Sequence, residues 1–190
     1  MANTMRLFIA VEMDAAVREH IEKIRQRLRK EASLPKGAVK WVEPENTHLT
    51  LIFLGETADN RVMEVCRIME DAAAAHSAFD MEVKGLGTFG NPARVVWAGI
   101  TGNPALKALQ TNLRGTFEEA GFPVENREFS GHLTLCRIRA PSAGDVLKRK
   151  IEPLRDEIFG VSFADSVCVF ESQLSGGGPK YAVVRRVKLK

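Results

Sequence analysis

The sequence predicts an α+β protein made of two interlocked lobes. Apolar residues follow strand and helix periods in alternation, so that strands and helices succeed each other in two similar halves. Each half contains the tetrapeptide His-Leu-Thr-Leu, at residues 48–51 and again at residues 132–135. No stretch has the composition of a linker, and 190 residues suit one domain. We therefore expect a single domain over residues 1–190, with one copy of the tetrapeptide in each lobe.

Apolar runs and turn residues define the elements of the first half. Residues 6–12 form a short apolar run ending in an acid, which is typical of a buried strand. Asp14 is a candidate cap for the helix that follows, whose apolar face recurs every three or four residues. The remaining predictions are a strand over 39–42, a turn over 44–46, a strand over 47–54 that Gly55 ends, a helix over 59–75 and a strand over 79–89.

The second half repeats this alternation. Asn103 and Pro104 form a helix start, with asparagine as the cap and proline as the first helical residue, and Gly121 is the expected end of that helix. The other predictions are a turn over 90–92, strands over 94–100 and 132–138, a helix over 142–152 limited by Pro153, strands over 161–170 and 181–189, and a glycine-rich hairpin turn over 175–179.

Composition limits the class of protein. Hydrophobic residues make up 45% and charged residues 27%, as in an ordinary soluble globular protein. No apolar stretch approaches the roughly 20 residues of a membrane span, and the N-terminus lacks the features of a secretory signal, so a cytoplasmic location without a membrane partner is expected. The three cysteines are far apart, which predicts free thiols. A net charge of +3 permits a phosphate-bearing ligand without demanding one.

The repeated tetrapeptide carries the chemistry. Side chains at i and i+2 of a strand share a face, so His48 and Thr50 point together while the two leucines point into a core. His132 and Thr134 repeat this arrangement. If the two strands meet across a groove, that groove holds two imidazoles and two hydroxyls. A lone strand histidine is usually structural, but two identical copies at matching places favour function.

Two imidazoles suit the opening of a cyclic phosphate. One removes a proton from water, and the other protonates the departing oxygen, because histidine titrates near neutral pH. Threonine hydroxyls and nearby cations can hold the phosphoryl oxygens. This reaction requires no metal and no cofactor, and the sequence contains no evident metal cage. His20 and His76 lie on or near charged helical segments, and no function is assigned to them.

At these residues the chain resembles the two-histidine phosphoesterases, and most closely the LigT-like RNA 2′,3′-cyclic phosphodiesterases, also called 2′-5′ RNA ligases. The signature of that family is a duplicated His-x-Thr/Ser-x motif, present here at His48 and His132. The similarity extends along nearly the whole chain. It includes RLFIAVE at residue 6, WVEPENTHLTLIFLGE at 41, RVVWAGI at 94, REFSGHLTLCRI at 127 and ESQLSGGGPKYAVV at 171.

The resemblance implies a bilobal, pseudo-two-fold fold in which antiparallel sheets surround a central cleft. It implies that His48 donates a proton to the leaving 3′ oxygen and that His132 activates water, so that the product is a 2′-phosphate. Thr50 and Thr134 would contact the phosphate, and Arg137 would assist with charge or substrate. The implied substrate is RNA or an oligonucleotide with a 2′,3′-cyclic phosphate end, tRNA fragments included. A monomer is the default expectation for a chain of this kind.

Several positions near the motifs keep two interpretations. Arg137, five residues after His132, can clamp phosphate, but it lies off the histidine face unless the strand bulges. Phe129 can stack on a base or pack in the core, Arg127 lies near the implied cleft, and Tyr181 can border it. Trp41 and Trp97 are expected in the core, and the basic C-terminal segment is expected to be a charged edge strand. Gly131 and Cys136 depart from the proline and alanine common in the family, and the loop over 90–94 is short.

Four alternatives remain open from the sequence. The same histidines can catalyse the reverse reaction, which joins RNA ends through a 2′-5′ bond. The substrate can instead be a small cyclic phosphate or nucleotide. A nucleotide- or RNA-binding module without turnover is a different class, and loss of a motif residue would indicate it, but all four are intact. A metal-dependent hydrolase would need at least three converging ligands.

Overall fold

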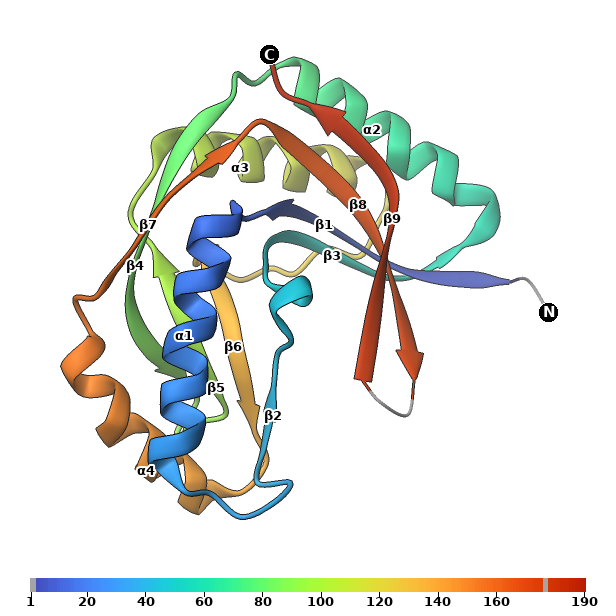
Figure 1. The fold of residues 1–190 in the computed structure, drawn as a ribbon. Coiled ribbons are helices and arrows are strands. Elements are labelled where there is room, and N and C mark those ends of the chain that lie inside the picture. Colours follow the sequence, from blue (N-terminus) through green and yellow to red (C-terminus); the bar gives the residue numbers. More distant parts are fainter. Residues whose placement is uncertain (1–2, 176–177) are drawn as a thin grey trace.

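The fold contains two antiparallel sheets, seen in the computed structural model of Figure 1, which describes residues 3–175 and 178–190. One sheet has four strands in the order β3-β1-β8-β9, and the other has five in the order β2-β6-β5-β4-β7. The strands are β1 (Thr4–Glu12), β2 (Val39–Trp41), β3 (His48–Ala58), β4 (Phe79–Phe89), β5 (Val95–Ile100), β6 (His132–Ile138), β7 (Ile158–Ala164), β8 (Ser166–Ser175) and β9 (Gly178–Lys188). The predicted α+β class with antiparallel sheets is confirmed.

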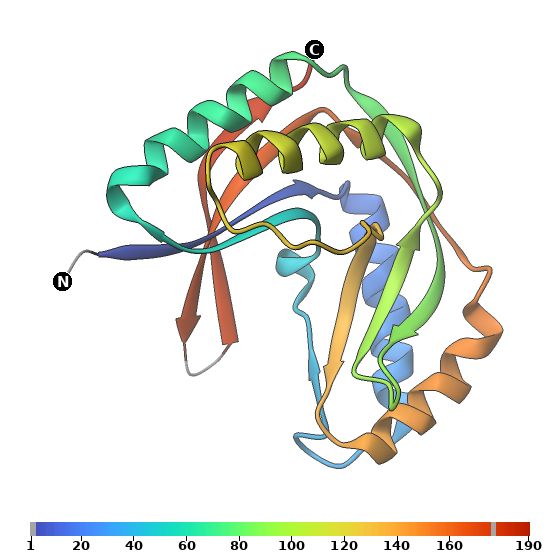
Figure 2. The ribbon, with the colours of Figure 1, turned by 180° about the vertical axis from the view of Figure 1, so that it is seen from behind.

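Four helices cover the sheets. They are α1 (Ala15–Ala32), α2 (Val62–Ala74), α3 (Pro104–Glu119) and α4 (Pro141–Ile151). Helices α2 and α3 pack together over one face of the four-stranded sheet, while α1 and α4 lie against the five-stranded sheet (Figures 1 and 2). Among the described residues, no helix is both long and apolar enough to cross a membrane.

The sheets do not correspond to sequential halves of the chain. The four-stranded sheet combines β1 and β3 from the start of the chain with β8 and β9 from its end, while β2 joins the five-stranded sheet. The first tetrapeptide lies in β3 and the second in β6, so the two copies belong to different sheets. The division of residues 1–190 into two lobes of one domain stays a prediction.

A continuous hydrophobic core joins the sheets to their helices. It includes Leu49 and Leu133, each with no exposed surface, and Phe117 of α3. A second cluster, made of Phe8, Ala10, Cys168 and Phe170 with Tyr181 packed against it, lies on the other face of the four-stranded sheet. Because β3 carries residues to both faces, it connects the core with the surface that holds the candidate site.

Most predicted elements are present, with one clear error near the C-terminus. The single strand expected over 161–170 is wrong, because the chain leaves β7 at Ala164 and enters β8, in the other sheet, at Ser166. Asp165 lies at this crossing, where its carbonyl accepts a hydrogen bond from the Leu189 amide. Exposed apolar residues in β7 extend the alternation up to the crossing, which made the two strands look like one.

Of three residues predicted to begin or end an element, only one does so in the structure. Gly55 does not end the first motif strand, because β3 continues to Ala58 and Gly55, with φ of +68°, pairs with Leu7. Asp14 does not cap α1, because its carboxylate accepts a hydrogen bond from the Phe163 amide at 2.9 Å. Asn103 does cap α3, since its Oδ1 accepts from the Leu106 amide at 3.0 Å.

Gly121 ends α3 as predicted, because the helix runs to Glu119 and Gly121 follows the Ala120 cap with φ of +74°, while the Phe122 amide donates to the Phe117 carbonyl at 2.9 Å. Several other observed boundaries differ from the predicted ones by a few residues. The helix predicted over 59–75 begins with a 3₁₀ turn before α2. Helix α4 begins one residue early at Pro141 and gives way to a 3₁₀ turn that contains Pro153. The final strand β9 begins at Gly178. The predicted glycine turn includes Gly176 and Gly177, which lie outside the described residues. The three cysteines are free, as predicted, and all three are buried.

Candidate active site

The two tetrapeptides line one cavity of about 730 Å³. His48 and Thr50 reach it from β3, and His132 and Thr134 reach it from β6. All four side chains are half-buried, while the leucines between and after them are buried in the core. The alternation predicted from strand geometry is therefore confirmed, and one cavity holds two imidazoles and two hydroxyls.

Both motif strands bulge at the same position. The pairing of β1 with β3 skips Leu51, and the pairing of β5 with β6 skips Leu135, so the fourth residue of each tetrapeptide is the extra one. A bulge shifts the following side chains by one position, which returns the residue at i+5 to the face of the histidine. Phe53 and Arg137 occupy these equivalent places, and both line the cavity. The bulge removes the geometric objection to Arg137 as a cavity residue.

His132 is held through one of its ring nitrogens. Its Nδ1 lies 2.7 Å from the Ser130 carbonyl oxygen, and this contact requires Nδ1 to carry the proton and donate it. The Nε2 atom of the neutral ring is then left as an acceptor. The ring also meets Phe89 edge-on, with centroids 4.8 Å apart.

The electrostatic surroundings of His132 favour its neutral form. Burial lowers its pKa, the Ser130 carbonyl acts in the opposite direction, and the charges of Arg127 and Arg137 lower it further. A neutral imidazole with a free Nε2 is what a general base requires at neutral pH.

His48 has a more apolar environment. Its ring stacks on Phe8 with centroids 4.9 Å apart, lies 5.8 Å from the Phe170 ring and meets Tyr181 edge-on at 5.1 Å. Burial lowers its pKa to about 4, although a backbone hydrogen bond to Asn46 partly opposes this shift. Asn46 and Ser130 each lie two residues before their histidine, so both rings are oriented by the same local contact.

The other predicted site residues also reach the cavity. Arg127, Phe129, Arg137 and Tyr181 all line it. Arg127 is largely exposed, and its Nε lies 2.6 Å from a carboxylate oxygen of Glu125. This carboxylate partly neutralises the positive charge of Arg127. Phe129 is half-buried and packs against the core as well, which leaves both of its predicted roles in place. Tyr181 contacts the His48 ring, and burial raises its pKa.

The aromatic contacts of the two histidines were not predicted from the sequence. Phe8 and Phe170 come from β1 and β8, and Phe89 lies at the end of β4. Their positions in apolar strands resemble ordinary core positions, so only the sheet order distinguishes them. Trp41, expected in the core, packs against it but also lines the cavity.

Trp97 stands behind Phe89, with ring centroids 5.2 Å apart. It lies over Gly87, where an added Cβ would collide with the indole, so glycine leaves the space that this ring occupies. Within residues 3–175 and 178–190, no three His, Cys, Asp or Glu side chains converge as a metal site would require.

The profile of the family described as LigT like Phosphoesterase matches residues 11–97 and 100–181. This chain belongs to that family. This chain is 32% identical over 179 residues to an RNA 2′,3′-cyclic phosphodiesterase of Methanothermobacter thermautotrophicus, and the match covers 93% of this chain and 95% of the relative. It is also 32% identical over 185 residues to an enzyme of the same description from Archaeoglobus fulgidus, covering 95% and 98%.

Solved structures agree with this assignment. Crystalline E. coli LigT complexed with 3′-AMP superposes with a TM-score of 0.82 at 25% identity, covering 99% of each chain. The TT0787 protein of Thermus thermophilus gives a TM-score of 0.80 at 26% identity, covering 97% of this LigT-like phosphoesterase and 98% of the other chain. The fold expected from the family resemblance is confirmed.

The lowered pKa of His48 predicts an acid-dependent loss of stability. The folded protein keeps this ring neutral down to about pH 4, whereas an unfolded chain protonates it near 6.5. Between these values the unfolded state binds more protons, so stability falls as the pH drops through this window. From pH 7 to pH 5, the wild type should lose about 2 kcal/mol more unfolding free energy than His48→Gln. Urea unfolding at both pH values measures this difference, and equal losses in the two proteins would contradict it.

Proposed function

We propose that this LigT-like phosphoesterase is an RNA 2′,3′-cyclic phosphodiesterase that opens the terminal cyclic phosphate and leaves a 2′-phosphomonoester. The observation that carries the proposal is that both His-Leu-Thr-Leu copies line one cavity, each with its imidazole oriented by a backbone contact two residues earlier. Relatives at about 30% identity over nearly the full chain carry the description of that enzyme. The complex of E. coli LigT with 3′-AMP supports a nucleotide as the ligand.

His132 acts as the base in the proposed reaction. Its Nε2 takes a proton from water as the water oxygen bonds to phosphorus. The bond between phosphorus and the 3′ oxygen breaks with its electron pair on that oxygen, and protonated His48 supplies the proton. Atoms and charge balance, because the two histidines together exchange one proton. Regeneration transfers that proton back through solvent.

The phosphate of the bound substrate raises the pKa of His48 and so allows it to act as the proton donor. A ring whose pKa is about 4 is mostly neutral at neutral pH, and a neutral imidazole is a poor acid. An anionic phosphate placed beside the ring favours the protonated form and therefore raises the pKa in the complex. Thr50 and Thr134 line the same cavity and would donate to the non-bridging oxygens, and Arg137 adds positive charge from the same strand face as His132.

The reverse reaction, 2′-5′ ligation, uses the same atoms in the opposite order. It requires a 5′-hydroxyl RNA end to take the place of water at phosphorus, so hydrolysis is the proposed direction when no second end is held. Independence of metal, a monomeric state and a cytoplasmic location remain predictions from the sequence.

The proposed function is tested with an RNA oligonucleotide that ends in a 2′,3′-cyclic phosphate, incubated in excess chelator. The expected product carries a 2′-phosphate, identified by phosphorus NMR and mass spectrometry. Parallel reactions with 2′,3′-cyclic AMP and 3′,5′-cyclic AMP test the small-molecule alternative. Binding of the oligonucleotide without turnover would favour a binding module, and activity only after metal is added would contradict metal-independent catalysis.

A further inference from the structure

A pair of cations faces the cavity from two neighbouring strands. Lys40 of β2 is the direct cross-strand partner of Arg137 of β6, and both side chains line the cavity. Directly opposed residues of an antiparallel pair point to the same face, with their Cβ atoms about 5 Å apart. Like charges at such positions destabilise the sheet. The arrangement is therefore explained by a negatively charged group that binds between or beside them.

The carboxylates of the cavity do not supply that negative charge. Glu43 lies against Arg25, with the closest atoms 3.7 Å apart, and Glu125 lies against Arg127. The third carboxylate, Glu128, lies on the loop before β6. Within the described residues neither Lys40 nor Arg137 forms an ion pair, and their charges remain available for a ligand.

A third cation comes from α1. Arg29, in the last turn of this helix, also lines the cavity and has no ion-pair partner among the residues described. Its position near the helix C-terminus is electrostatically favourable in itself, so its charge does not depend on a ligand. Its presence on the cavity wall nevertheless adds to the positive charge of the cavity.

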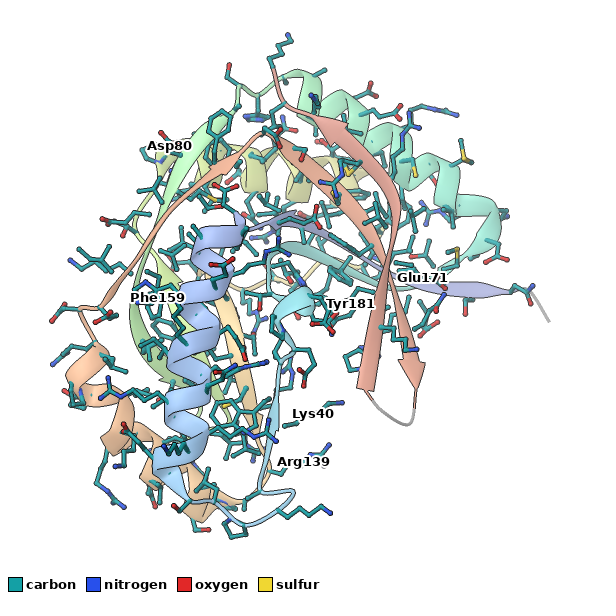
Figure 3. The ribbon with its side chains drawn as sticks, viewed as in Figure 1. Lys40, Asp80, Arg139, Phe159, Glu171 and Tyr181 are labelled. Atoms are coloured by element: carbon teal, nitrogen blue, oxygen red, sulfur yellow. The ribbon has the colours of Figure 1, made fainter. Side chains whose placement is uncertain are left out.

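These cations lie beyond the reacting groups. Along β6 the cavity face carries His132, Thr134 and then Arg137, and Lys40 follows on the adjacent strand. In Figure 3, Lys40 extends from β2 into the space below Tyr181, on the side of the β8–β9 hairpin. A cavity of about 730 Å³ is within the range that encloses a drug-sized ligand, so it has room for more than a cyclic phosphate ring.

We propose that Lys40, supported by Arg29, forms a subsite for a second phosphate, the one joined to the 5′ oxygen of the terminal nucleoside. Arg137 then lies between the two phosphates, and the ligand is an RNA chain rather than an isolated nucleoside cyclic phosphate. The proposal of this subsite rests on the proposed function, because the other phosphate is the 2′,3′-cyclic phosphate whose ring the two histidines open. A lysine ammonium suits this task, since it binds phosphate as a point charge without fixed geometry.

Binding of product-like ligands tests the subsite without requiring turnover. Isothermal calorimetry compares adenosine 2′-monophosphate with adenosine 2′,5′-bisphosphate and with the dinucleotide ApA that carries a terminal 2′-phosphate. The wild type should bind both two-phosphate ligands about tenfold more tightly than the monophosphate. Lys40→Ala should lose most of this advantage, and Lys40→Arg should keep it. Lys148→Ala, which removes an exposed lysine of α4 outside the cavity, is the matched control and should behave like the wild type.

The outcomes separate the subsite from the catalytic proposal. An equal advantage of the two-phosphate ligands in wild type and Lys40→Ala would overturn the subsite even if the enzyme opens cyclic phosphates. A Lys40-dependent advantage for the dinucleotide would support it even if turnover fails. Dependence on Lys40 for the bisphosphate alone would overturn the assignment to an RNA chain and indicate a free 5′-phosphate.

Discussion

Replacing either motif histidine with alanine is expected to lower kcat/KM for a cyclic-phosphate RNA by about 10²–10⁴-fold. His48→Ala removes the proposed proton donor and His132→Ala removes the proposed base, while neither side chain belongs to the hydrophobic core. Steady-state rates with a fluorescent oligonucleotide measure the loss, and circular dichroism verifies folding. His20→Ala is the matched control, because this histidine lies against Glu157 and outside the cavity, and its activity should equal that of the wild type.

The two losses should differ in how they are rescued. A substrate whose 3′ bridging oxygen is replaced by sulfur has a leaving group that needs no protonation. It should restore much of the activity of His48→Ala and little of that of His132→Ala. Rescue of His132→Ala instead would reverse the assigned roles, and equal rescue of both would contradict a division into acid and base.

The largest effect on stability is expected from a leucine inside the second motif. Leu133 has no exposed surface and packs in the core behind the cavity face of β6. Leu133→Ala should therefore lower the unfolding free energy by about 2–5 kcal/mol, since it leaves a cavity as well as losing buried apolar area. Urea unfolding measures this change. Thr134→Ala, the neighbouring substitution on the cavity face, should lower stability far less while reducing activity, and a similar loss in both variants would contradict the alternation.

Strand periodicity was sufficient to predict which motif residues reach the cavity. His48, Thr50 and their counterparts alternate with leucines, and this pattern depends only on the chain itself. The prediction that Asn103 caps α3 was also correct, because a helix cap depends only on contacts with the first turn of its own helix. These predictions succeeded because each depends on contacts within a few residues.

Features that depend on sheet assembly were not predictable. The bulges at Leu51 and Leu135 exist only in relation to β1 and β5, so the sequence left the face of Arg137 open. The aromatic surroundings of His48 come from strands far apart in the chain, and the crossing at Asp165 lies within an uninterrupted apolar alternation. Asp14 also bonds a strand amide across the fold, which its resemblance to a helix cap concealed.

The duplicated motif gives the site matching geometry but unequal environments. Both copies carry a bulge at the fourth residue and a ring held by the backbone two residues earlier. His132 lies within the influence of two arginines, which favour a neutral base, while aromatic rings surround His48. Identical tetrapeptides can therefore serve different roles because neighbouring strands differ.

The most direct test is a single-turnover reaction of the cyclic-phosphate RNA in ¹⁸O-labelled water with chelator, followed by phosphorus NMR. We expect one ¹⁸O atom in a 2′-phosphate product for the wild type and no product on the same timescale for His48→Ala or His132→Ala. A 3′-phosphate, a product without ¹⁸O, or unchanged turnover in either variant would contradict catalysis by the two histidines.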